Sequence, residues 1–142
     1  MTLAKLDLKS KNQLLRHLAA AIRSDDRDEF CTQTQIGVAY FDQQTVADIL
    51  NRELPLVLDT KYIPRLLKFM VGEDQYIDTV RSFLAELTQV MASNGFTVGV
   101  DFSYGEKDGI PYIAMSEATA LKVENIYEPH AWKQCSPFLI IQ

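Results

Sequence analysis

The sequence is poor in residues that bind metal ions. It contains two cysteines and two histidines in 142 residues. Cys31 and Cys135 lie far apart without a Cys-x-x-Cys spacing, and only His17 and His130 could join them. We therefore expect no metal site and no cofactor, and we interpret both cysteines as reduced thiols of a cytosolic protein.

Long apolar runs are also lacking. No run approaches the roughly 18 residues that a membrane-spanning helix requires. The amino-terminal residues, MTLAKLDLKSKN, carry too many charges for a signal peptide. We expect a protein that works in the cytoplasm and does not bind a membrane.

Positive charge is scarce, because 14 Lys and Arg stand against 19 Asp and Glu, for a net charge of −5. Broad phosphate binding needs many cations that displace counterions, so this balance disfavours non-specific nucleic-acid binding. Lys61, Arg65 and Lys68 are a local exception, since their spacing places them on one face of a helix. The acidic run at residues 24–29 is interpreted as a solvated loop or helix end.

Sequence signatures of catalysis are missing as well. No serine or cysteine stands in a nucleophile elbow, and no spacing singles out a pair of carboxylates. Gly95 and Gly99 lack the lysine that follows a phosphate-binding loop. We therefore expect a non-enzymatic protein.

What the sequence does contain is a series of amphipathic patterns, over a length that predicts a single domain, residues 1–142. The predicted elements before residue 75 are a helix opened by a capping box at residues 10–13, a strand at 35–41, a helix capped by Asp42 and ended by Pro55, and a helix that starts at Asp59 or Thr60 with Pro64 in its first turn.

The strongest helical pattern covers residues 76–91 and predicts full burial of Phe83 and Leu87. Asn94 and Gly95 then favour a helix end.

The stretch from Asn94 to Tyr127 predicts a hairpin followed by a helix. Alternation indicates a strand at residues 96–102, glycines and charges indicate a turn at 104–109, and a short apolar run indicates a second strand at 110–115. Ser116 is the expected helix cap. The predicted fold class is therefore α+β, with about five helices and a small antiparallel sheet. Whether the arrangement is winged-helix-like stays open.

The apolar tail gives a candidate interface. Such residues fray in water unless something covers them, either as an added strand on the sheet or through a protein partner or a second copy of the chain. The residues assigned to this interface are Phe138, Leu139, Ile140 and Ile141.

DNA binding is the alternative function. The order of helices and hairpin is that of winged-helix proteins, in which the helix of Lys61, Arg65 and Lys68 would enter the major groove. Lys107 at the hairpin tip would then contact the backbone. Glu106 and Asp108 on either side of it have the wrong sign for phosphate.

One segment resembles a known family. Gly95-Phe96, Asp101-Phe102-Ser103, Tyr112-Ile113 and a helix that includes Glu117-Ala118 and Val123-Glu124-Asn125 resemble the N-terminal domain of phage antirepressors of the AntA/AntB type, related to KilA-N and Bro-N domains. Phe41 to Leu50 is similar to the opening of that domain. The resemblance implies a small phage or prophage regulator of transcription that acts on a repressor or on DNA. The acidic composition favours protein binding.

Overall fold

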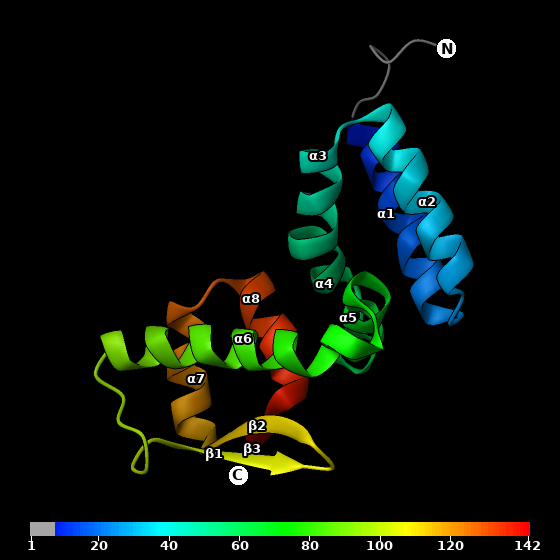
Figure 1. Cartoon of the computed structure of the whole chain (residues 1–142). Coiled ribbons are helices and arrows are strands. Elements are labelled where there is room, and N and C mark those ends of the chain that lie inside the picture. The colour runs from blue at the N-terminus through cyan, green and yellow to red at the C-terminus, as the bar shows by residue number, and fades with distance from the viewer. Residues whose placement is uncertain (1–7) are drawn as a thin grey trace. The chain divides into compact units, whose positions relative to one another are not determined.

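The computed structural model describes the backbone of residues 8–142 and the side chains of residues 10–142 (Figure 1). The chain divides into two compact units, the first ending at Phe69 and the second beginning at Met70. The predicted single domain stays a prediction. The α+β class is confirmed, with helices α1 to α8 in place of the about five predicted and a sheet in the order β1-β2-β3.

The first unit is helical. Helices α1 (Leu8–Arg23) and α2 (Arg27–Tyr40) lie side by side and are followed by α3 (Gln43–Asp48), a π-helical turn (Ile49–Glu53), α4 (Leu54–Val57), a 3₁₀ turn (Thr60–Tyr62) and α5 (Ile63–Val71) (Figure 1). Ser10 lies inside α1, so the prediction that it caps this helix is wrong. Asp42 does cap α3, because its carboxylate accepts the Thr45 amide at 2.6 Å.

The prediction of a strand at residues 35–41 is wrong, because helix α2 continues through this segment as far as Tyr40. The alternating Ile36, Val38 and Tyr40 are all about 40% exposed and do not form a buried face. Burial falls instead on Gly37, where an added Cβ would lie 2.6 Å from the Leu14 side chain. Close packing of α2 on α1 therefore outweighed the strand preference that the alternating apolar residues indicated.

The prediction that Pro55 ends its helix is wrong. The chain widens into the π-helical turn, in which the Leu54 amide bonds to the Ile49 carbonyl, and helix α4 then runs to Val57. Pro55 thereby falls in the first turn of α4, where a missing amide is tolerated. Pro64 lies in the first turn of the next helix, as predicted, but the predicted start at Asp59 or Thr60 is a 3₁₀ turn and the α-helix itself begins at Ile63.

The second unit packs helices on a small mixed sheet. It contains α6 (Glu73–Ser93), β1 (Phe102–Lys107), β2 (Ile110–Met115), α7 (Glu117–Ile126), α8 (Pro129–Cys135), a 3₁₀ turn (Ser136–Phe138) and β3 (Leu139–Ile141). Helix α6 contacts both β2 and α8. Strands β1 and β2 are antiparallel, whereas β3 pairs parallel to β2, so the sheet is not wholly antiparallel as predicted.

Helix α6 confirms the strongest helical prediction. Leu87 is fully buried, but Phe83 is only half-buried, because it lies at the side of the stripe formed by Val80, Leu84 and Leu87. The helix ends as predicted, with Gly95 at a φ of 89° and the Phe96 amide bonded to the Met91 carbonyl at 3.0 Å.

The predicted hairpin is displaced along the chain. Residues 97–101 form a loop closed by the Thr97 amide and the Asp101 carboxylate at 2.7 Å, so the first strand begins at Phe102. The turn is the pair Asp108 and Gly109, with φ of 54° and 79°, a favoured two-residue hairpin turn. Ser116 caps α7 as predicted, and the tail adds a strand to the sheet.

Candidate functional site

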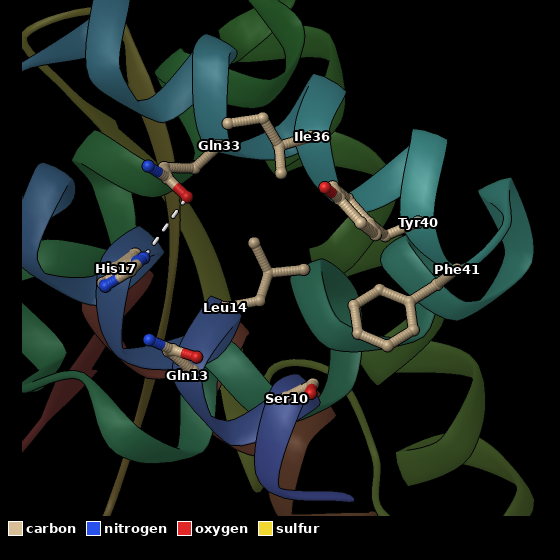
Figure 2. Close-up of a pocket in the computed structure, with 9 residues that line it drawn as sticks. Ser10, Gln13, Leu14, His17, Gln33, Ile36, Tyr40 and Phe41 are labelled. Carbon is tan, nitrogen blue, oxygen red and sulfur yellow. Dashed lines mark hydrogen bonds between the residues drawn. The ribbon is translucent and has the colours of Figure 1, made fainter. Parts of the chain in front are cut away.

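The candidate site is a groove of about 330 Å³ between α1 and α2 of the first unit (Figure 2). The buried Leu14 side chain lies at its base, with Ile36, Tyr40 and Phe41 on one side. The lining residues are Ser10, Gln13, Leu14, His17, Gln33, Ile36, Gly37, Tyr40 and Phe41.

Helical spacing brings these side chains together. Gln13 and His17 are four residues apart on α1, while Gln33, Ile36 and Tyr40 are three and four residues apart on α2. Gly37 permits α2 to approach α1 closely, since any side chain there would enter the space of Leu14. The base of the groove is thus a packed helix contact, and its rim is formed by longer polar and aromatic side chains.

The groove offers hydrogen bonds and apolar surface. His17 Nδ1 and the Gln33 side-chain oxygen lie 3.3 Å apart across it. Among the residues whose side chains are described, no Lys, Arg, Asp or Glu lines it, and there is no group of three or more potential metal ligands. Such a groove suits an apolar side chain from a binding partner, held within a rim of amides.

The helix face beside the groove is unusually apolar for an exposed surface. From Thr32 to Phe41 the chain has no charged residue. Within that stretch Ile36 is 43% exposed and Tyr40 is 39% exposed on the side of α2 that lines the groove. Val38 is also exposed, but it is two residues from each of them and lies on another side of the helix. Ile36 and Tyr40 therefore add exposed apolar surface at the edge of the groove, and apolar surface gathered in one place is typical of an interaction site.

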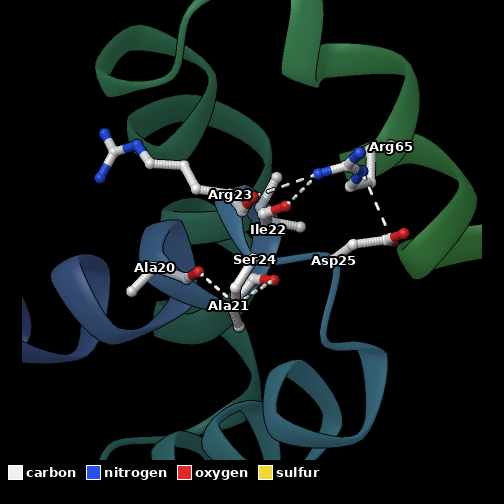
Figure 3. Close-up of polar contacts among 7 residues, drawn as sticks. All are labelled: Ala20, Ala21, Ile22, Arg23, Ser24, Asp25 and Arg65. Carbon is white, nitrogen blue, oxygen red and sulfur yellow. Dashed lines mark hydrogen bonds and ion pairs between the residues drawn. The ribbon is translucent and has the colours of Figure 1, made fainter.

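Arg65, predicted to bind DNA or a partner, is used within the fold (Figure 3). Its guanidinium donates to the Ile22 carbonyl at 2.8 Å and lies 3.5 Å from the Asp25 carboxylate. These contacts satisfy carbonyls at the end of α1, where a cation is also favoured by the helix dipole. The middle cation of the predicted basic face therefore stabilises a helix end.

The other predicted cations lie in different settings. Lys61 is exposed, with its ammonium 5.1 Å from the centre of the Tyr62 ring, and Lys68 is half-buried in α5. Lys107 belongs to the second unit, where it ends β1 and is exposed next to Glu106 and Asp108.

The tail residues divide into two pairs. Phe138 is buried against the Tyr76 ring, with ring centres 6.1 Å apart, and Leu139 is half-buried. Ile140 and Ile141 remain 39% and 46% exposed. Only the second pair is available for the predicted interface.

The buried thiol of Cys135 is not set up as a nucleophile. Its Sγ lies 3.7 Å from the Phe83 carbonyl oxygen, which it donates to. Burial raises the pKa of this thiol to about 12, and burial likewise raises the pKa of Tyr127 beside it. The reactive thiolate form is therefore absent near neutral pH.

No family model, curated protein or solved structure matches this chain. None of the described helices is long and apolar enough to cross a membrane. Sequence reasoning missed the groove because it assigned residues 35–41 to a strand. The uncharged stretch from Thr32 to Phe41 was the signal that could have revealed it.

Proposed function

We propose that this protein is a non-enzymatic interaction protein that binds a partner protein through the groove between α1 and α2. The observation that carries the proposal is the groove itself, which combines an apolar base, a rim of polar groups and the exposed apolar side chains of Ile36 and Tyr40. The resemblance of the Gly95–Asn125 segment to phage antirepressor domains suggests the biological role, control of a transcriptional regulator through protein binding.

The partner segment that fits is an amphipathic helix. Two neighbouring helices leave a groove into which a third helix can pack its side chains. Because no Lys, Arg, Asp or Glu among the described side chains lines this groove, the apolar side chains of the partner would supply the affinity. Gln13 and Gln33 would bond to polar groups at the edge of that helix.

The test uses a synthetic amphipathic helical peptide with leucines on one face, titrated into isotope-labelled protein and followed by NMR. We expect shifts confined to α1 and α2, and their loss in Ile36→Asp. Leu56→Asp is the matched control, because Leu56 is 49% exposed on α4 of the same unit but does not line the groove. The same peptide with serines in place of leucines should not bind. Equal binding by wild type and Ile36→Asp, or no shifts at all, would overturn the proposal.

DNA binding through Lys61, Arg65 and Lys68, in a winged-helix-like manner, is the competing function, and the use of Arg65 at the end of α1 weakens it. Three phosphate contacts would give a log–log salt slope of roughly −2 to −3. We expect no binding to duplex DNA tighter than micromolar at physiological salt. A gel shift of a defined sequence at nanomolar protein would favour the DNA function instead.

A further inference from the structure

We propose that the free edge of β3 is a second binding site, which takes an extended basic segment of a partner protein by strand addition. This site lies in the second unit and does not depend on the groove between α1 and α2. Three observations support it: the direction of the backbone groups of β3, the absence of charge and proline from that strand, and the charge of the unit.

The hydrogen bonds of β3 show which backbone groups face outward. The Gln142 amide donates to the Met115 carbonyl at 2.9 Å, and the Gln142 carbonyl accepts from the Glu117 amide at 3.3 Å. In a parallel pair alternate residues of an edge strand bond to the neighbouring strand, so Ile140 also bonds toward β2. Leu139 and Ile141 consequently point their backbone groups away from the sheet.

Three of these outward groups are available. The Leu139 amide donates to the Ser136 carbonyl at the end of the 3₁₀ turn. Among the residues that the structure describes, the Leu139 carbonyl and both backbone groups of Ile141 have no partner strand, because β3 is the last strand in the sheet order. An added strand would bond to these three groups, which is the mode of recognition known as strand addition.

The two edges of the sheet differ in protection. Strand β1 ends in Glu106 and Lys107, and its first residue, Phe102, is bridged by Val98. Strand β3 contains no charged residue and no proline, and it exposes Ile140 and Ile141. Charge, proline and short length are means by which proteins limit pairing at an edge; β3 has neither charge nor proline, and its three residues limit an added strand to a short pairing.

Charge selects the kind of strand. Residues 70–142 contain four Lys and Arg and ten Asp and Glu. Residues 1–69 contain ten Lys and Arg and nine Asp and Glu, so the acidic charge is concentrated in the second unit. Pairing of two copies through β3 would bring two acidic units together, which like-charge repulsion disfavours. A segment in which apolar residues alternate with Lys or Arg is attracted instead. Because side chains alternate between the two faces of a strand, such a segment can place its apolar residues beside Ile140 and its cations on the opposite face.

The test uses two fluorescent hexapeptides, one with valine alternating with lysine and one with glutamate in place of lysine. We expect the lysine peptide to bind the full chain, and the glutamate peptide not to bind. Ile141→Pro removes an outward amide without removing a bond to β2, and it should weaken binding about tenfold. Ile141→Ala, which keeps the amide, is the matched control and should bind within about threefold of wild type.

Hydrogen exchange supplies a readout that does not depend on a variant. The lysine peptide should slow exchange of the Ile141 amide and leave residues of the α1/α2 groove unchanged. Equal binding by Ile141→Pro and wild type, equal binding of the two peptides, or unchanged exchange at Ile141 would overturn the proposal. Sedimentation showing a dimer that Ile141→Pro dissociates and Ile141→Ala does not would assign the edge to a second copy of the chain and overturn the proposal. Each of these results leaves the groove proposal intact, because that proposal is tested in the other unit.

Discussion

At the scale of single residues, Asp42 decides where one helix begins and how the first unit responds to acid. The pKa of Asp42 is lowered below its ordinary value of 3.8. The larger cause is the hydrogen bond from the Thr45 backbone amide to the Asp42 carboxylate, and the smaller is the hydrogen bond from the Thr45 side chain. A lowered pKa means that the stabilisation is present above that ordinary value and is lost as the pH falls through the folded-state value.

We expect Asp42→Ala to lower the melting temperature at pH 7, because the Thr45 amide loses its acceptor. Asp42→Asn keeps an oxygen acceptor but does not titrate. It should therefore retain most of the cap at pH 7, and its melting temperature should fall less than that of the wild type as the pH is lowered. Thermal melts followed by circular dichroism between pH 7 and pH 2 would measure this. Parallel pH profiles for wild type and Asp42→Asn would contradict the assignment.

At the scale of elements, α6 organises the second unit through one buried stripe. Leu87 is fully buried within it, and Phe83 lies at its side, half-buried. Truncation of a buried leucine removes its transfer free energy and leaves a cavity. The two positions therefore differ in cost even though the phenylalanine is the larger residue.

We expect Leu87→Ala to lower the free energy of unfolding by about 2–5 kcal/mol. Phe83→Ala should cost less than the roughly 3–5 kcal/mol typical of a fully buried phenylalanine. Urea unfolding curves would give both values. If Phe83→Ala proves the more damaging of the two, the half-burial of that ring is not the relevant state in solution.

At the scale of the whole molecule, the open question is whether the two units unfold together. Each contains about half of the chain. A domain of that size buries only about 60% of the surface of its unfolded chain and has marginal stability alone. This argues for one cooperative transition, as the predicted single domain requires.

The sequence provides a probe for this question. Trp132 is the single tryptophan and lies in α8 of the second unit, whereas far-ultraviolet circular dichroism reports on the helices of both units. We expect the two signals to follow coincident denaturation curves. A tryptophan transition displaced from the circular dichroism transition would instead demonstrate two independent domains.

Features that depend on neighbours along the chain could be read without the structure. Periodicity predicts the helix at residues 76–91. A side chain that bonds to a nearby amide predicts the helix caps at Asp42 and Ser116, and the left-handed conformation open to glycine predicts the helix end at Gly95. The turn at Asp108 and Gly109 belongs to the same class, because Asp-Gly is a strong hairpin signal that the alternation before Phe102 obscured.

Features that depend on contacts between distant residues were decided by the tertiary structure. Ile36, Val38 and Tyr40 alternate like a strand, yet packing of Gly37 on Leu14 makes the segment a helix and opens the groove beside it. The role of Arg65 is of the same kind, since the carbonyl it binds is 43 residues away in the chain. Local pattern limits what a segment can form, but burial against a partner chooses among the possibilities, because the free energy of packing exceeds the small differences in intrinsic propensity.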